Sequence, residues 1–319
     1  MRRGVRFPQW FLLLVAVLGI LSGCQSLRDL ERFAIRHHAA LNQALGLELR
    51  RPPTDSTFRY LFLQVDVAEI CRQLQDWMLS QIPDGAAGLD QLVCDGKTLR
   101  GSIVATDGGG GAFIAKVTLY SKALGAAIAQ ATYDTRENHE RAVLRELLST
   151  MDLEGVLIQA DAIHTQKPFF RQLTEQGADF LLTVKANQRT LHRQISEQFL
   201  YSRNIRFIAT VSEHGHGRDT TWTLRVKQAP DFITEAWPGS SWIVELIVSG
   251  KRAGKPSLQR HLFLTSLRTT LKALLQLMRD RWIIESWHWL KGTQLYEDGH
   301  RYGGPGAAVL ATLRTLAPG

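Results

Sequence analysis

The stretch of sequence that decides the fold is GVLIQAD at residues 155–161, an apolar run that ends on an acidic residue. A helical segment at 168–176 and a second apolar run at 179–185 follow it directly. Strand–helix–strand order predicts parallel pairing through a right-handed crossover. We therefore expect an α/β fold built on a mainly parallel sheet.

The sequence on both sides extends this α/β pattern. Residues 92–95 (LVCD) form another short apolar run that ends on an acid, and residues 112–120 and 126–133 have the character of two strands. Residues 138–151 form an amphipathic helix with its apolar side chains on one side. Residues 200–268 contain several β-like stretches between turns, so we expect a β-rich insertion before a strong helix at 270–290.

The N-terminal quarter follows a different pattern. Apolar residues recur at helical spacing through residues 9–82, and Pro52-Pro53 interrupts them, so Thr54 or Asp55 would cap the next helix. Residues 83–88 (PDGAAG) are typical of a linker. The sequence thus predicts a small all-α N-terminal domain over 1–83 and an α/β domain over 89–319.

Composition narrows the partners and the compartment. The chain has 319 residues, 45% of them hydrophobic, and a formal charge of +8. A basic excess favours a polyanionic partner, although a basic enzyme without a nucleic acid partner fits equally well. Cys24, Cys71 and Cys94 are odd in number and have no zinc-site spacing, which favours a reducing cytoplasm over a disulfide framework.

The first 24 residues allow another interpretation. Arg2, Arg3 and Arg6 precede an apolar run at 10–21, and LSGC follows at 21–24. Basic residues, a short apolar stretch and small residues before a cysteine are typical of a lipoprotein signal. An exported lipoprotein anchored at Cys24 is therefore one hypothesis, and a buried N-terminal helix is the other.

Two acids close the short apolar strands. A crossover between their strands would bring Asp95 and Asp161 to the same edge of the sheet. Clustered carboxylates repel each other, and a divalent cation relieves that repulsion, with oxygen ligands suiting Mg²⁺ or Mn²⁺. The alternative is that each Asp only begins a turn or caps a helix.

A third acid lies in the late helix. Arg281, Glu285 and His288 are spaced to share one face of a helix expected over 272–290. Apolar neighbours would hold that face against the sheet: Leu274, Leu277, Met278, Trp282 and Trp289. The alternative is a surface Arg–Glu pair of little energetic value.

These residues lie in blocks that resemble a known family. CDGKTLRGS at 94–102 closely resembles the DGKTLRGS signature of bacterial insertion-sequence transposases of the ISAs type, a branch of the DDE transposases that includes the H-repeat-associated proteins. Further blocks resemble the same family in the same order: ADAIHTQ at 160–166, DFLLTVKANQ at 179–188, HGR at 216–218, RWIIE at 281–285 and EDGHRY at 297–302. The resemblance covers nearly the whole chain.

The resemblance implies an RNase H-like core with Asp95 on the first strand, Asp161 at the end of the fourth, and Glu285 on a helix after the β-rich insertion. It also implies a DNA transposase that cleaves the ends of an insertion sequence and transfers the strands. The three acids would be catalytic and would hold Mg²⁺ or Mn²⁺, as two ions.

The resemblance also implies contacts with DNA. Arg281 would contact a phosphate, with His288 on the same helical face, and Lys185 and Asn187 would contact the transposon end. Lys97 and Arg100 lie beside Asp95 and would grip the backbone, unless they are only solvated charges on a loop. The expected partners are double-stranded DNA, as terminal inverted repeats and target, and a second copy of the chain in a homodimer.

The resemblance extends to the N-terminus, where residues 7–24 fit the first helix of the family's N-terminal domain. The lipoprotein-like run is then a buried helix that mimics a signal, and we expect a cytoplasmic, nucleoid-associated protein without a membrane partner. The pair His214 and His216 is expected on a flexible loop near DNA and not in a metal site.

The sequence departs from the family near its C-terminus. Gly292 occupies the position where the wider IS-four-like group usually has lysine, and the stretch 290–292 lacks an acid that relatives carry. Relatives also continue beyond the residues that match 310–317. An alternative hypothesis is therefore a truncated copy that binds DNA without cutting it.

Overall fold

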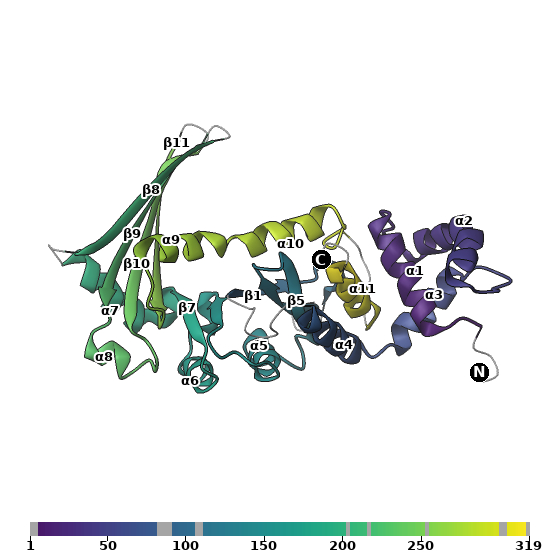
Figure 1. The fold of residues 1–319 in the computed structure, drawn as a ribbon, viewed down its shortest axis with the longest axis horizontal. Helices are drawn as coiled ribbons and strands as arrows, with labels where there is room; N and C mark the ends of the chain where they lie inside the picture. Colours follow the sequence, from purple (N-terminus) through teal and green to yellow (C-terminus); the bar gives the residue numbers. More distant parts are fainter. Residues whose placement is uncertain are drawn as a thin grey trace.

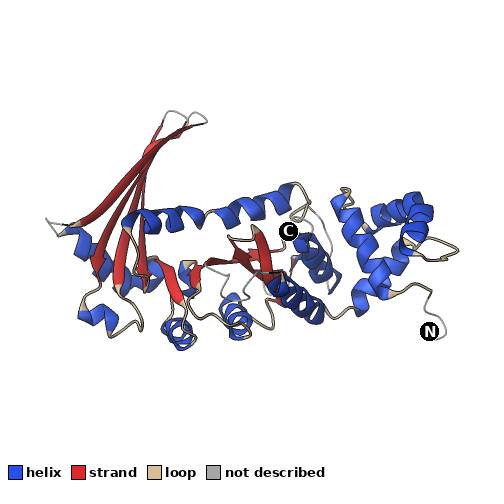
Figure 2. Cartoon of the chain, viewed as in Figure 1, coloured by secondary structure: helices blue, strands red, loops and turns tan. Residues whose placement is uncertain are grey.

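The computed structural model describes residues 6–81, 91–105, 111–201, 205–215, 218–252, 255–299 and 305–316. Within these residues, one large mixed sheet carries helices on both faces, and a group of helices lies at the N-terminal end (Figures 1 and 2). The predicted α/β class with a helical N-terminal region is confirmed.

The sheet has nine strands in the order β5-β4-β1-β6-β7-β11-β10-β9-β8. They are β1 (Gln91–Thr98), β4 (Ile114–Ser121), β5 (Ala126–Asp134), β6 (Leu157–Ala160), β7 (Asp179–Val184), β8 (Phe207–Gly215), β9 (Arg218–Gln228), β10 (Trp242–Arg252) and β11 (Lys255–Thr265). Two short strands, β2 (Val104–Ala105) and β3 (Gly111–Ala112), pair separately.

The prediction of a mainly parallel sheet is wrong. Among the described strands, only β1 with β6 and β6 with β7 pair in parallel, and helices α5 and α6 lie in the connections that lead into β6 and β7. Strands β4 and β5 return as a meander, and β8–β11 are consecutive hairpins. The first five strands have the order third-second-first-fourth-fifth with the second reversed, which is the RNase H-like arrangement.

The predicted β-rich insertion continues this sheet. Strand β11 pairs antiparallel with β7, so Leu262 lies opposite Val184. Strands β8–β11 then carry the sheet beyond the core, and their far ends project from the body of the molecule (Figure 1).

Strand alternation divides the core between the two faces of the sheet. One face packs on α5 (Glu140–Ser149), α6 (Lys167–Glu175), α7 (Arg189–Leu200) and α8 (Asp231–Thr234). The other face packs on α9 (Leu271–Asp280) and α10 (Ile283–Thr293). Cys94 belongs to the first face and Val93 to the second, as period-two alternation requires.

The single helix expected over 270–290 is two helices. Thr270 caps α9 by accepting from the Ala273 amide, and a turn at Arg281–Trp282 separates α9 from α10. The Trp282 ring packs on Trp222 and His261, with ring centroids 5.2 and 6.0 Å away. Leu274 and Met278 face the sheet as predicted, whereas Trp289 is exposed, contrary to the prediction.

The N-terminal helices are α1 (Gln9–Leu21), α2 (Leu27–Leu45), α3 (Asp55–Gln64) and α4 (Val67–Ser80). A side chain caps the start of α2, α3 and α4, whereas α1 begins after Pro8 without such a cap. Ser26 and Asp29 form a capping box, and Thr54 caps α3 as predicted. The linker predicted at 83–88 lies outside the described residues.

The lipoprotein-like run forms α1, which is a core helix. Its Phe11, Val15 and Ile20 are buried in a cluster with α2, α3 and α11 (Pro305–Leu316). None of the described helices is long and apolar enough to cross a membrane. The N-terminal helices therefore share their core with the last helix of the chain.

Candidate active site

Two of the three predicted acids meet because of strand register. Strands β1 and β6 are parallel neighbours with Cys94 opposite Ala160, so Asp95 and Asp161 occupy adjacent positions. Strand β6 ends at Ala160, as predicted for the second acid. Strand β1 instead continues to Thr98, because Asp95 pairs with Thr118 of β4 on the other side.

Helix α10 brings the third acid to the same place. Ile284 and Trp287 are buried against Val93 and Tyr120, which fixes α10 over β1. Asp95, Asp161 and Glu285 then line one cavity of about 140 Å³, together with Lys185 and Arg281. Residues almost 200 positions apart in the sequence thus share one small space.

Asp161 lies in a cationic environment. Lys185 Nζ is 2.9 Å from Asp161 Oδ1 and 3.2 Å from Oδ2, and Arg281 Nη2 is 3.8 Å from Oδ1. Burial by itself raises the pKa of the Asp161 carboxyl, but Lys185, the Ala162 amide and Arg281 outweigh it and hold that pKa below its ordinary value. Asp161 is therefore ionised at neutral pH.

Asp95 faces a buried histidine. His288 Nε2 lies 3.2 Å from Asp95 Oδ2, and the His288 side chain is 12% exposed. Burial lowers the pKa of His288 although Asp95 opposes that shift. His288 therefore lies against Asp95 and is largely covered, and its contact with DNA stays a prediction.

Arg281 lies in the turn before α10 and donates to Thr183 Oγ1 of β7. Sequence reasoning missed Thr183, although a buried threonine within an apolar strand is a usable signal. It also missed His261 of β11, whose pKa is lowered by burial and by nearby Arg281 and Lys185.

The other predicted DNA contacts divide into three situations. Arg100 is exposed in the 3₁₀ turn Arg100–Ser102 and is free to meet a ligand. Asn187 Nδ2 donates to the Ala162 carbonyl at 2.8 Å, so it steadies the turn after Asp161. Lys97 is 13% exposed and lies 2.9 Å from Glu297 Oε2, so its predicted grip on a DNA backbone finds no support.

Of the two histidines predicted on a flexible loop, only His214 belongs to the described residues. His214 lies in β8, where its Nδ1 is 2.8 Å from Asp219 Oδ1 of the paired strand β9, and so it is not on a loop. His216 lies outside the described residues.

The donor chemistry of the cavity suits a hard divalent cation, because carboxylate oxygens are the ligands that Mg²⁺ and Mn²⁺ prefer. The carboxylates are not already gathered around one point: no three His, Cys, Asp or Glu side chains of the described ranges form a ready metal-binding group. Asp161 pairs with Lys185 and Asp95 with His288 instead. The ligand types therefore fit a metal ion, while their grouping requires side-chain movement.

Known proteins resemble this chain over most of its length. The family described as "Transposase DDE domain" matches residues 94–317, and the one described as "DDE_Tnp_1-associated" matches residues 1–78. The "uncharacterized protein in dhlA 3'region" of Xanthobacter autotrophicus is 32% identical over 259 residues, 80% of this chain and 86% of that protein. The H repeat-associated putative transposase YhhI of Escherichia coli K12 is 25% identical over 318 residues, 96% of this chain and 82% of that protein.

One solved structure gives a weaker match. The cryo-EM structure of the piggyBac transposase synaptic complex with hairpin DNA has a TM-score of 0.47 and 12% identity to this chain. The match covers 96% of this chain and 63% of that chain, so this chain spans less than two thirds of its length.

Proposed function

Because this chain belongs to the family of transposases with a DDE domain, we propose that it cuts DNA at the ends of an insertion sequence and joins them to a target. The observation that carries the proposal is the convergence of Asp95, Asp161 and Glu285 on one cavity. A member of the same family that only binds DNA would not require these three acids to converge.

The three acids would hold Mg²⁺ or Mn²⁺, as two ions. When bound, the metal supplies an activated water or 3′-hydroxyl and stabilises the leaving oxygen of the phosphodiester. The chain contributes the ligands, with Asp161 kept ionised by its basic neighbours. The burial of Ile284 and Trp287 orients the helix that carries Glu285.

The basic residues of the cavity would take the DNA phosphates. The Lys185 side chain is 55% exposed, so it can leave Asp161 for a phosphate oxygen. Arg281 is oriented by Thr183 and presents a fork that suits phosphate. Arg100 adds an exposed cation beyond β1, and Asn187 fixes the turn that carries Asp161.

The proposed partners are the terminal inverted repeats and the target DNA. Joining requires two ends to be held together, so we propose that a homodimer forms on the DNA. The proposed place of action is the nucleoid, where that DNA lies.

The test uses the purified full chain, labelled duplex DNA carrying the element's end, and Mg²⁺. We expect strand cleavage in the wild type and a loss of about 1000-fold in Asp95→Asn, Asp161→Asn or Glu285→Gln, since each removes a ligand worth several kcal/mol in the transition state. The matched control is Asp231→Asn, which changes an exposed aspartate in α8 and should cleave normally.

The outcomes separate the alternatives. Cleavage that survives equally in all four variants would falsify the assignment of the three acids. A wild type that binds end DNA and never nicks it, with Mg²⁺ or Mn²⁺, would show that the chain is a DNA-binding remnant.

A further inference from the structure

We propose that Glu297 is a positioning residue for the reaction proposed above: it ties α10, which carries Glu285, to β1, which carries Asp95. The inference rests on the proposed function. It concerns a buried group of charges that neither the metal ligands nor the DNA contacts use, here called the Glu297 cluster: Lys97, Lys116, Lys291, Glu297 and Asp298.

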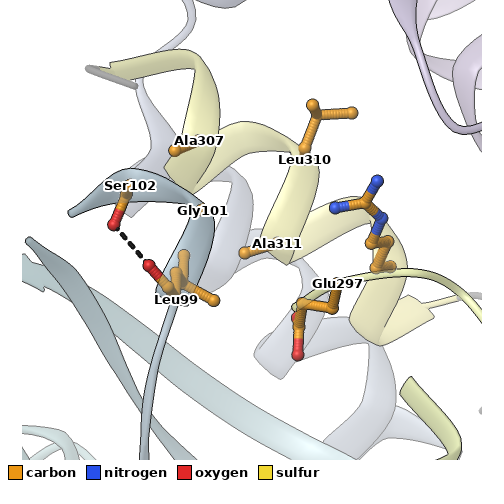
Figure 3. A pocket seen from close by; sticks show the side chains of 8 residues that line it. Leu99, Gly101, Ser102, Glu297, Ala307, Leu310 and Ala311 are labelled. Atoms are coloured by element: carbon orange, nitrogen blue, oxygen red, sulfur yellow. Dashed lines mark hydrogen bonds between the residues drawn. The ribbon is translucent and has the colours of Figure 1, made fainter. Parts of the chain in front are cut away.

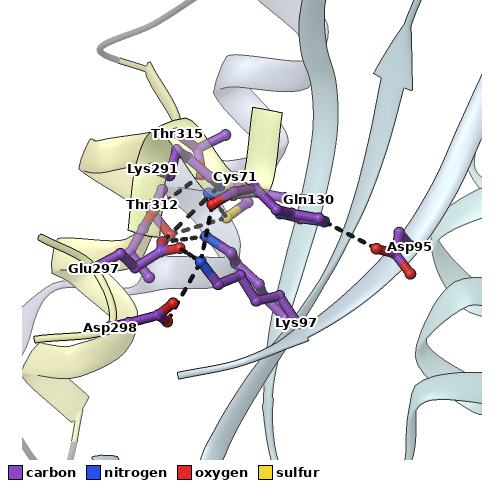
Figure 4. A network of polar contacts seen from close by, with 12 residues as sticks. Cys71, Asp95, Lys97, Gln130, Lys291, Glu297, Asp298, Thr312 and Thr315 are labelled. Atoms are coloured by element: carbon purple, nitrogen blue, oxygen red, sulfur yellow. Dashed lines mark hydrogen bonds and ion pairs between the residues drawn. The ribbon is translucent and has the colours of Figure 1, made fainter. Parts of the chain in front are cut away.

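The cluster is built around one carboxylate. Lys116 donates to Glu297 Oε1, Lys97 Nζ lies 2.9 Å from Glu297 Oε2, and Lys291 Nζ is 3.9 Å from Oε1. Asp298 adds a second, less buried acid 3.4 Å from Lys97 Nζ. Figure 4 shows Lys97 and Lys291 turned toward Glu297 from separate elements.

Burial makes this carboxylate a strong tether. The Glu297 side chain is 1% exposed, and those of Lys116 and Lys291 are fully buried. Burial raises the pKa of Glu297, but Lys116, Lys291 and Lys97 together hold it well below its ordinary value. Removing the negative charge would leave Lys116 and Lys291 without an acidic partner in a dry space, while Lys97 would keep only Asp298. Burial and the neighbouring Lys116 already lower the pKa of Lys291, so the fold can respond by losing that proton or by moving the elements apart.

The elements that would move are those that carry the acids. Lys97 lies two residues after Asp95 on β1, and its Nζ donates to the His288 carbonyl of α10 at 3.3 Å. Lys291 lies six residues after Glu285 on α10, above the Trp287 ring at 3.6 Å. The Glu297 amide also donates to the Lys291 carbonyl at 3.1 Å. Glu297 therefore bridges the two elements through its side chain, and its backbone adds a second link to α10.

Gly292 belongs to the same arrangement. A Cβ at position 292 would lie 2.8 Å from Asp298 Oδ2 and 3.4 Å from Lys97 Nζ. A lysine here, as in the wider group, would displace the Asp298 carboxyl group, while its Cβ would lie at ordinary contact distance from Lys97 Nζ. The glycine that departs from the family pattern thus leaves room for the Asp298 carboxyl group beside α10.

The far side of the cluster is closed by the last helix. Lys291 Nζ donates to Thr315 Oγ1 of α11 at 3.1 Å. Glu297 also lines a cavity of only about 10 Å³ between α11 and residues 99–102, room for one water molecule at most (Figure 3). Packing this tight leaves Glu297 little freedom to shift without moving β1 or α10.

The test is Glu297→Gln in the full chain, which keeps the side-chain shape and removes its charge. We expect end cleavage to fall about 10- to 100-fold, and the Mn²⁺ concentration that half-saturates the protein–DNA complex to rise about 10-fold. Mn²⁺ binding is followed by electron paramagnetic resonance, which does not depend on turnover. DNA affinity in metal-free buffer should stay within twofold of the wild type, since Glu297 does not reach the surface.

The matched control is Asp280→Asn. It breaks the Lys122–Asp280 ion pair at the end of α9, in which the aspartate is also largely buried, without touching the cluster. A general loss of stability would affect both variants alike, whereas positioning predicts weaker Mn²⁺ binding only in Glu297→Gln.

A second variant covers the case in which Glu297→Gln does not fold. Lys97→Met leaves Glu297 paired with Lys116 and Lys291 and removes the links from β1 to Glu297, to Asp298 and to the His288 carbonyl. It should weaken Mn²⁺ binding in the same way. If a folded variant of either kind binds Mn²⁺ and cleaves as the wild type does, the positioning role is overturned while the proposed function stands. If the wild type neither binds Mn²⁺ nor cleaves DNA, the positioning role and the proposed function are both overturned.

Discussion

At the scale of the residue, the surroundings of a charged side chain decide its contribution. Lys185 and Lys97 both lie in blocks that resemble the family, and the sequence alone predicts that both contact DNA. Lys185 is half exposed and reaches Asp161 in the cavity, whereas Lys97 is buried against Glu297. Only the first can exchange its partner for a phosphate, because a buried charge that loses its partner is strongly unfavourable.

The pH dependence of the free energy of unfolding should reveal how much the charge of Glu297 stabilises the fold. Its folded pKa lies below the ordinary value of 4.5, so its charge stabilises the fold above about pH 4.5, and this contribution is lost as the pH falls through the lower folded pKa. Glu297→Gln should lower the free energy of unfolding by about 3–5 kcal/mol at pH 7, the cost typical of breaking a buried pair.

Urea denaturation at several pH values checks this expectation. The difference in the free energy of unfolding between wild type and Glu297→Gln should shrink steadily below pH 4.5, because acid then protonates the wild-type carboxyl group as well. A gap of constant size from pH 7 to the acid limit would show that the charge of Glu297 does not stabilise the fold.

At the scale of the element, close approach between β1 and α5 depends on one glycine. A Cβ at Gly96 would collide with the Glu140 carboxyl group at the start of α5. Glu140 Oε1 is in turn 2.8 Å from Nε2 of the buried His164, which follows Asp161 closely in the chain. The glycine beside Asp95 therefore lets an acid of α5 lie against β1 and pair with the turn after β6.

Gly96→Ala should lower stability by about 1–3 kcal/mol, as expected when a side chain is forced into a filled space. Combining it with Glu140→Ala should recover part of that loss, since the colliding carboxyl group is gone. Denaturant unfolding of both single variants and the double variant measures the interaction. Strictly additive effects would contradict a direct contact between these positions.

At the scale of the whole molecule, the two ends of the chain share a core. Val309, Leu310 and Leu313 of α11 are buried in the same cluster as Phe11 and other residues of α1, α2 and α3. The same helix holds Lys291 of the Glu297 cluster through Thr315. The last helix thus contacts both the N-terminal helices and the side of the core next to the candidate active site.

Leu313→Ala should lower the free energy of unfolding by about 2–5 kcal/mol, the usual cost of a cavity at a buried leucine. It should also speed proteolysis within α1 and α2, because their shared core opens. Leu258→Ala is the control: that side chain is 74% exposed, so its effect should stay within about 0.5 kcal/mol. Unchanged protection of α1 in the Leu313 variant would argue against a shared core.

The local elements and the chemistry of the acids could be predicted from the amino-acid sequence. Apolar periodicity placed the strands that carry Asp95 and Asp161, and capping residues such as Thr54 marked where helices begin, because these signals act between near neighbours in the chain. Ordered family blocks determined the fold class.

How those elements meet depends on packing between distant parts of the chain. The pairing of β11 with β7, the contact of Arg281 with Thr183 and the place of Lys97 depend on partners that are far away in the chain. No local pattern encodes such contacts, since burial and ion pairing arise when distant surfaces pack. The same reason explains why a glutamate of the last family block, Glu297, lies buried among lysines from β1, β4 and α10.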